Sequence, residues 1–354
     1  HIDLAGQFVM NGSAVAGYDF ISNNTIANDP NPGRDADPLD TGDTCDSEPS
    51  SWHGTHVAGT IAAANNGIGI VGMAYNAKIL PVRVLGRCGG LLSDVAAAIV
   101  WAAGGVVKGV PLNPNPAKVI NLSLGASSNV CSTTMANAIN TANAKGAVVV
   151  VAAGNDSVNV KYATPANCPA AVTVAATNYR GDLTWWTNYG LLVDVSAPGD
   201  LIYSTYNTGV TSAAADSYEY LSGTSMAAPH VAALYAMVFE VNQTASLKEI
   251  DLIVKMTTNH FSSDEGFVDI GGSGIIDAQK TLNSQNVEKI WKTKGDFDGN
   301  GISDLLWRNL KNGSTKISNV SLSSLDTNEI FLLPNSVPYT DPQYRIEATA
   351  DFNG

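Results

Sequence analysis

Three short apolar runs, rich in β-branched residues, place the strongest limit on how this chain can fold. They are Lys78–Leu85 (KILPVRVL), Lys118–Leu124 (KVINLSL) and Ala147–Ala153 (AVVVVAA). Continuous runs of this length are typical of strands buried on both faces, as in a parallel sheet. Segments with helical character alternate with them, at His53–Asn65, Ser93–Ala103 and Ser132–Lys145. The alternation predicts an α/β domain with a mainly parallel sheet flanked by helices.

This alternation stops near Leu282, which predicts the end of the first domain. A polar stretch at 283–294 precedes a segment rich in glycine and aspartate, and short β-type pieces follow at Leu305–Trp307 and Ile330–Leu333. The Asp-Phe pair at 296–297 recurs at 351–352, which suggests the start of a second repeat. We expect a first domain at 1–284, a linker at 285–294, and a small, partial all-β repeat domain at 295–354.

The charge of the chain argues against two classes of partner. Its 354 residues include 19 basic and 32 acidic side chains, for a formal net charge of -13. Such a field repels nucleic acid and anionic membrane surfaces, so we expect neither as a partner. The longest uncharged apolar segment, Val95–Val107, is shorter than the roughly 20 residues that cross a bilayer. No signal peptide opens the chain, and we expect both of its ends to be cut edges of a longer protein.

The four cysteines are spaced too widely for a zinc knuckle or a redox Cys-x-x-Cys pair. An even number in a chain rich in glycine, asparagine and serine favours two disulfides and an oxidising compartment. Sequence alone leaves three pairings open. Bridges between neighbouring loops, Cys45–Cys88 and Cys131–Cys168, fit the predicted topology.

The strongest chemical signal is the segment Gly223-Thr-Ser-Met-Ala-Ala-Pro-His230. Ser225 has small neighbours and precedes a helical run, so we expect it at a helix N-terminus with an uncrowded hydroxyl. Its backbone N–H would then be unpaired and could face an oxyanion. Taken alone, such a serine is usually a helix cap. The interpretation therefore depends on residues elsewhere in the chain.

Two histidines lie in the segment SSWHGTHVAGT at 50–60. His53 precedes a helix start that contains glycine, which leaves its ring free to face a cleft. His56 lies one turn on, among apolar residues, and a structural role suits it. A metal site on the pair is a weak alternative, because no third ligand follows at a recognisable interval.

A third segment, Gly154-Asn155, follows the apolar run that ends at Ala153. Ligands of open parallel sheets bind beyond the carboxyl ends of the strands, where the segments after Leu124 and Ala153 should lie. Asn155 could be only a turn residue. Near a serine and a histidine, however, its neutral amide could stabilise the oxyanion of an acyl-transfer reaction.

Together these segments resemble the subtilases, the subtilisin-like serine proteases. The resemblance runs from residue 1 to about 284 and rests on HGTHVAGT at 53–60, SLG at 123–125, AAGN at 152–155, SAPG at 196–199 and GTSMAAPHVA at 223–232. It implies a secreted, monomeric serine endopeptidase that acts on protein or peptide substrates and needs no organic cofactor. Ser225 would be the nucleophile, His53 the general base, and Asn155 the oxyanion donor. The substrate would lie between two segments and pair with them as an extra strand. These segments are Ser123, Leu124 and Gly125, and Ala152, Ala153 and Gly154.

The resemblance also implies an acid that this chain does not supply. The family's triad aspartate ends an apolar strand in an Asp-Thr/Ser-Gly motif, a few residues before a His-x-Asp-Leu segment, which here is His1-Ile-Asp3-Leu4. We therefore expect the aspartate and its strand upstream of residue 1, and the chain as it stands to be inactive and one strand short. Asp40, in Asp40-Thr-Gly, and Asp3 are interpreted as loop residues, since a polar stretch with a proline precedes Asp40.

Oxygen-bearing residues at alternate positions predict a calcium loop near the C-terminus. They are Asp296, Asp298, Asn300, the carbonyl of Ile302, and Asp304, although an ordinary Asp-Gly turn is the alternative. The run is similar to FG-GAP/VCBS repeats, calcium-loop blades of β-propellers, and that implies adhesion or targeting. A second structural Ca²⁺ site is predicted in the acidic loop 28–46, because crowded carboxylates repel one another unless a cation joins them. Its candidate ligands are Asp29, Asp35, Asp37, Asp40 and Asp43.

A function from another class also has to be weighed. The chain could be a calcium-dependent binding or adhesion protein built on an inactive protease-like scaffold. The absent aspartate and the repeat at 295–354 support that alternative. The presence of His53, Asn155 and Ser225 together weighs against it, because a decayed scaffold has no reason to keep all three.

Overall fold

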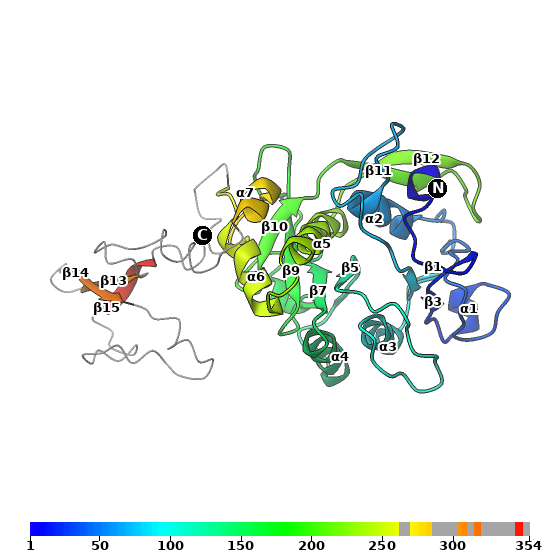
Figure 1. Cartoon of the computed structure of the whole chain (residues 1–354), viewed down its shortest axis with the longest axis horizontal. Coiled ribbons are helices and arrows are strands. Elements are labelled where there is room, and N and C mark those ends of the chain that lie inside the picture. The colour runs from blue at the N-terminus through cyan, green and yellow to red at the C-terminus, as the bar shows by residue number, and fades with distance from the viewer. Residues whose placement is uncertain (262–269, 285–303, 310–314, 320–343, 350–354) are drawn as a thin grey trace.

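The computed structural model describes residues 1–261 and 270–284, and the strands at 304–309, 315–319 and 344–349 (Figure 1). Its centre is a four-stranded parallel sheet in the order β10-β9-β7-β5. These strands are β5 (Val119–Leu122), β7 (Val148–Ala152), β9 (Val172–Thr177) and β10 (Val195–Pro198). The expected α/β architecture with a mainly parallel sheet is confirmed.

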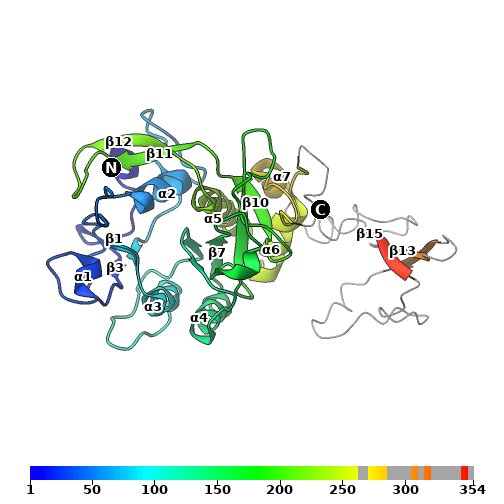
Figure 2. The ribbon, with the colours of Figure 1, turned by 180° about the vertical axis from the view of Figure 1, so that it is seen from behind.

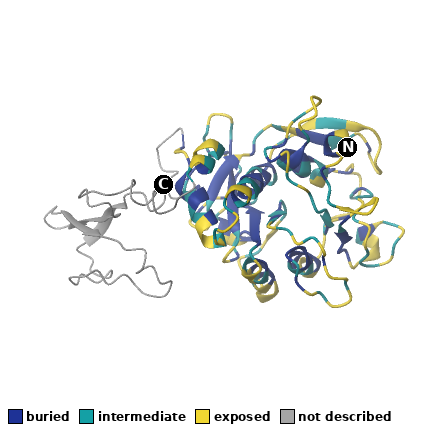
Figure 3. Cartoon of the chain, viewed as in Figure 1, coloured by how far each residue is buried: buried dark blue, intermediate teal, exposed yellow. Residues whose placement is uncertain are grey.

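Helices cover both faces of this sheet. Side chains at even positions of β7, such as Val148 and Val150, pack with the helices α5 (Thr224–Val241) and α6 (Leu247–Met256). Those at odd positions, such as Val149 and Val151, pack with α3 (Leu92–Ala102) and α4 (Thr133–Ala144). Successive side chains of a strand point to opposite faces, so β7 must be apolar throughout. The central strands are accordingly buried (Figure 3).

The N-terminal part of the chain builds a smaller layer around α2 (His53–Ala62). The antiparallel pair β11 (Ile202–Asn207) and β12 (Asp216–Leu221) packs on α2, close to the N-terminus, as the front and back views agree (Figures 1 and 2). The remaining short elements are η1 (Ile2–Leu4), β1 (Met10–Asn11), β2 (Ala14–Val15), β3 (Tyr18–Asp19), α1 (Asn24–Ala27), β4 (Val82–Arg83), β6 (Ala126–Ser127), η2 (Val160–Tyr162), β8 (Ala163–Thr164) and α7 (Ala278–Asn283).

The expected strands differ in how far they form. The run at 147–153 becomes the fully buried β7, whereas only Val82 and Arg83 of the run at 78–85 are in a strand. Pro81 interrupts that run and has no N–H for a ladder, and β4 pairs only with β3 among the described residues. β5 is buried at every second residue instead of throughout, at Ile120 and Leu122, whose side chains point to the face covered by α3 and α4.

A large cavity separates the two sets of parallel strands. Its volume is about 970 Å³, and it lies between Leu80, Val82 and Val84 on one side and residues 119–122 of β5 on the other. Side chains of α2 and α5 close it. Within the described part of the chain, β4 pairs only with β3, and β5 pairs only with β7. Each of these two strands therefore has one unpaired edge. The sheet is therefore interrupted at this point.

Near the C-terminus, β13 (Asp304–Asn309) pairs antiparallel with β14 (Thr315–Asn319) and with β15 (Tyr344–Thr349). The expected piece at Leu305–Trp307 thus lies in a strand, whereas Ile330–Leu333 is outside the described residues. None of the helices that the structure describes is long and apolar enough to cross a membrane.

The structure forms two disulfides, Cys45–Cys88 and Cys131–Cys168. This is the pairing that the topology favoured among the three possibilities. The first joins the acidic loop to the segment after β4. The second joins the start of α4 to the segment before β9.

Candidate active site

His53 is the first residue of α2, and an unusual backbone conformation precedes it. Trp52 has φ 45° and ψ 29°, in the left-handed region that a bulky residue rarely adopts. Its indole N–H donates to the Gly209 carbonyl oxygen at 2.6 Å, which holds the buried ring against the β11–β12 connection. The turn into α2 is therefore fixed by a contact distant in sequence.

The surroundings of the His53 imidazole favour its neutral form. Burial lowers the pKa of His53 below its ordinary value of 6.5, and the nearby His56 lowers it further. The negative charge of Asp43 acts in the opposite direction. Asp43 accepts hydrogen bonds from Ser51 N (2.7 Å) and Ser51 Oγ (2.5 Å), and Ser51 Oγ accepts one from His53 N at 3.4 Å. Sequence reasoning missed this link, which only the fold creates.

We expect the His53 imidazole of this chain to titrate below pH 6.5, and Asp43→Asn to lower its pKa further. A neutral amide at position 43 no longer favours the imidazolium form, so the imidazole would stay unprotonated to lower pH. NMR titration of the ring resonances measures both values. Asp37→Asn is the matched control, because Asp37 is exposed in the same loop and bonds only to backbone N–H groups. A pKa that rises in Asp43→Asn would contradict this prediction.

His56 has the structural role expected for it. The ring is fully buried, and its Nε2 lies 3.0 Å from the Ile202 carbonyl oxygen and 3.1 Å from that of Glu219. Nε2 therefore carries the proton and donates to both oxygens. His56 ties α2 to β11 and β12 and is not available for chemistry.

Ser225 lies in the first turn of α5, as expected. Its Oγ donates to the Ser123 carbonyl oxygen at 3.4 Å, and Ser123 Oγ donates to the Ser225 carbonyl oxygen at 2.7 Å. Ser123 thus ties the end of β5 to the start of α5. The helices α2 and α5 pack together, although no hydrogen bond joins His53 to Ser225 within the described residues.

The amide of Asn155 has a defined orientation. Its Oδ1 accepts from Thr224 N and from Thr224 Oγ1, each at 2.9 Å, and Thr224 Oγ1 accepts from Gly154 N at 3.0 Å. Because the oxygen is occupied, the Nδ2 group is the end without a hydrogen-bond partner in the part of the chain that the structure describes. A Cβ on Gly223 would lie 3.4 Å from Asn155 Nδ2 and 3.6 Å from Ser225 N. Two N–H donors therefore border the same small space at the start of α5.

The expected substrate-flanking residues lie at the carboxyl ends of β5 and β7. Ser123, Leu124 and Gly125 follow β5, and Gly125 is exposed. Ala153 and Gly154 follow β7, but their backbone groups already bond to Val174, Asn188 and Thr224. The N–H groups of both residues are thus occupied, whereas each carbonyl oxygen can accept a second hydrogen bond, so the expected pairing with a substrate strand stays a prediction. Thr224 and Asn188 were not foreseen, because they act through contacts between distant segments.

Neither Asp3 nor Asp40 stands in for a triad acid, although Asp3 lies in η1 instead of the expected loop. Asp3 is fully buried, and its carboxylate accepts from Asn66 Nδ2 (3.2 Å), Ile70 N (3.0 Å) and Tyr218 OH (2.8 Å). Asp40 accepts from Gly42 N at 2.9 Å, and burial raises the pKa of Asp40. Among the described residues, no carboxylate hydrogen-bonds to the ring of His53.

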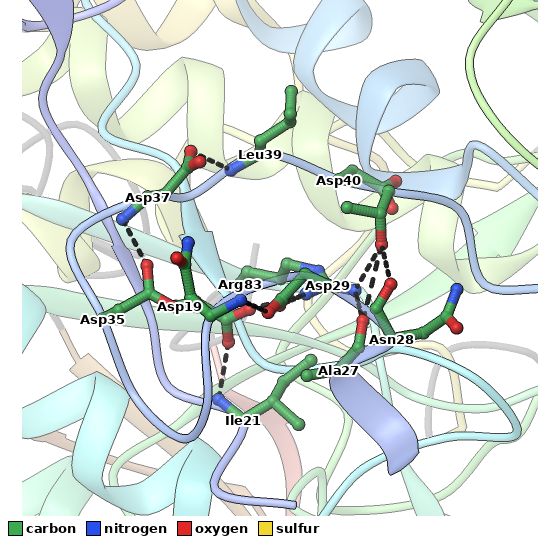
Figure 4. Close-up of polar contacts among 12 residues, drawn as sticks. Asp19, Ile21, Ala27, Asn28, Asp29, Asp35, Asp37, Leu39, Asp40 and Arg83 are labelled. Carbon is green, nitrogen blue, oxygen red and sulfur yellow. Dashed lines mark hydrogen bonds and ion pairs between the residues drawn. The ribbon is translucent and has the colours of Figure 1, made fainter. Parts of the chain in front are cut away.

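The acidic loop is organised around Arg83 (Figure 4). The guanidinium lies 2.6 Å from Asp19 Oδ2, 2.8 Å from Asp29 Oδ2 and 2.5 Å from the Ala27 carbonyl oxygen. Asp35 and Asp37 accept from backbone N–H groups further along the loop. The described residues hold no group of three or more acidic, His or Cys side chains arranged for a metal ion. Calcium binding by this loop stays a prediction that these contacts do not support.

The second predicted calcium site lies outside the described residues. Asp296, Asp298, Asn300 and Ile302 belong to the segment 285–303, and Asp304 begins β13.

Comparison with known proteins identifies the class to which this fold and site belong. The model of the subtilase family (Peptidase_S8) matches residues 5–288, so the chain is a member of that family. It is 50% identical over 285 residues to an extracellular protease of Xanthomonas campestris pv. campestris, covering 77% of this chain and 48% of the relative. It is 41% identical over 303 residues to an extracellular basic protease of Dichelobacter nodosus, covering 80% of this chain and 48% of the relative. The chain thus spans about half the length of these relatives.

A solved structure supports the same conclusion. A protease from Pseudoalteromonas arctica PAMC 21717 superposes with a TM-score of 0.76 at 46% identity, covering 81% of this chain and 86% of that one. These similarities show the subtilisin-like α/β fold. They do not show an FG-GAP/VCBS repeat at 295–354.

Proposed function

We propose that the protein is a secreted serine endopeptidase that hydrolyses peptide bonds of proteins through an acyl-enzyme on Ser225. The observation that carries this proposal is the pair of N–H donors, Asn155 Nδ2 and Ser225 N, bordering one space at a helix N-terminus. Family membership supports the reaction class, and the relatives named extracellular proteases support secretion.

The reaction assigns one role to each group. His53 takes the proton of the Ser225 hydroxyl as Oγ attacks the scissile carbonyl carbon, and the two N–H groups hold the oxyanion that forms. The imidazolium then donates this proton to the departing amine. Water, activated by the same imidazole, hydrolyses the ester and restores Ser225. These are the steps of the subtilisin triad, carried over position by position.

A carboxylate beside His53 is still needed to orient the imidazole, and the cavity between β4 and β5 suggests how it is supplied. We propose that a further parallel strand fills this cavity and ends with the triad aspartate. Two strand edges that are unpaired within the described residues face the cavity, and its lining is mainly apolar. Asn121 also lines it, and the buried Oδ1 of Asn121 has no hydrogen-bond partner among the described residues. Gly54, the residue after His53, lies on the same wall.

Residues 1–284 would then form the catalytic domain and 285–294 a linker. We propose that Asp296, Asp298, Asn300, Ile302 and Asp304 hold a Ca²⁺ ion in an FG-GAP/VCBS-like repeat at 295–354. The antiparallel pairing of β13 with β14 and β15 supports β structure in that segment. Calcium would have a structural role there and no part in the hydrolysis.

Labelling with a serine-directed fluorophosphonate tests the proposed function. The phosphonyl group bonds to an activated serine Oγ with loss of fluoride, so an adduct requires a working base and a nucleophile. We expect a single adduct on Ser225 in the full-length protein, located by peptide mass spectrometry, and its loss in His53→Ala. A full-length protein that stays unlabelled at every pH would instead indicate a scaffold without activity.

A further inference from the structure

One buried side chain fixes the backbone on both sides of Asn155. Asn188 lies between β9 and β10 and is fully buried. Its Nδ2 donates to the Ala153 carbonyl oxygen at 2.9 Å, and its Oδ1 accepts from Asp156 N at 3.0 Å and from Val158 N at 3.1 Å. The side chain therefore spans the loop from the residue two before Asn155 to the residue three after it.

The packing of Asn188 against this loop depends on glycine at position 154. The Asn188 backbone N donates to the Gly154 carbonyl oxygen at 2.9 Å, and Gly154 has φ 103°, which favours glycine. A Cβ at this position would collide with Asn188 Nδ2. The side chain of Asn188 thus packs against the backbone immediately before the oxyanion donor. Asn188 itself makes no hydrogen bond to Asn155 among the described residues.

The orientation of Asn155 has two supports. Thr224 holds the amide oxygen, while Asn188 holds the loop from which the side chain projects. An oxyanion donor acts only when it lies at about 2.7–3.1 Å from the developing charge. Displacements of about 1 Å in such groups cost roughly 100-fold in rate. A residue that fixes the loop can therefore control the rate without touching the substrate.

We propose that Asn188 is a positioning residue that sets the geometry of the oxyanion site through the 153–158 loop. This rests on the proposed role of Asn155. Substitution of Asn188 weakens the stabilisation of the transition state more than it weakens the binding of the substrate. The effect therefore falls on kcat and requires the amide of Asn155 to be present.

A double-mutant cycle in the full-length protein tests the proposal. Asn188→Asp keeps the shape and both acceptor bonds but opposes a carboxylate oxygen to the Ala153 carbonyl. We expect kcat for a peptide substrate to fall at least about 10-fold, and KM to change less than about 3-fold. In the Asn155→Ala background, the same substitution is expected to lower kcat less than about 2-fold, because no amide remains to be positioned.

Asn113→Asp is the matched control. Asn113 is also buried, donates to the Trp101 and Ala102 carbonyl oxygens and accepts from Asn115 N, but it lies beside α3. We expect it to lower the melting temperature and leave kcat unchanged. Should Asn188→Asp fail to fold, the uncharged Asn188→Ser goes through the same cycle.

The outcomes separate the two proposals. If Asn155→Ala lowers kcat but the effect of Asn188→Asp is absent or equal in both backgrounds, the positioning role is overturned alone. If Asn155→Ala itself leaves kcat unchanged, the oxyanion role of Asn155 is lost and the positioning role with it.

Discussion

Replacing Ser225 with alanine is expected to lower kcat for a peptide substrate by about 10⁶-fold in the full-length protein. This magnitude is the one measured for the nucleophile of subtilisin, a member of the same family. Without Oγ, no acyl-enzyme forms, and only water attack assisted by the oxyanion site remains. Because Ser225 is half-buried at a helix start that Gly223 and Thr224 define, the substitution should leave the fold intact.

Ser222→Ala is the matched control for this prediction. Ser222 lies three residues earlier, is exposed, and bonds to Asp200 Oδ1 and Leu201 N. It should keep its kcat within about 2-fold, because the described bonds of its side chain reach only Asp200 and Leu201 and a surface substitution usually costs little stability. Initial rates on a chromogenic peptide and melting curves of both variants give the comparison. A Ser225→Ala protein that retains normal turnover would refute the acyl-enzyme mechanism.

The strands β7 and β4 show that the presence of a strand could be predicted from the sequence, whereas its length could not. Val148–Ala152 is apolar at every position because helices cover both faces, so the segment itself carries the signal. The run at 78–85 has a similar composition, but its strand ends where hydrogen-bonding partners end. The extent of a strand depends on its neighbours, and a single segment does not contain that information.

In the candidate site, too, some residues could be predicted from the sequence and others could not. Small residues around Ser225, and the position of Asn155 directly after an apolar run, were visible in the sequence. Asn188 was not, because its role depends on contacts with a loop 30 residues away. The buried position of Arg83 could also have been predicted from the sequence. A charged residue inside an apolar run is almost never buried without a partner, and the neighbouring acidic loop offered one.

Extending the chain at its N-terminus with native sequence is expected to raise kcat about 10⁴-fold. A correctly placed aspartate fixes the imidazole tautomer and stabilises the imidazolium, and its loss costs about that factor. The proposed strand would also fill the cavity between β4 and β5 and bury its apolar lining. The melting temperature should therefore rise together with the rate. A carboxylate beside the imidazole should raise the pKa of His53, against the effect of burial that now lowers it.

A second variant separates the strand from the acid. With the aspartate of the added segment replaced by asparagine, we expect the melting temperature to stay high while kcat falls back by about 10⁴-fold. The cavity is then filled, but no negative charge faces the imidazole. The pH profile of the extended protein, compared with the NMR titration of His53, checks the pKa. Equal rates with and without the added segment would show that these residues do not use an acid from outside the described chain, and the role proposed for the cavity would be lost.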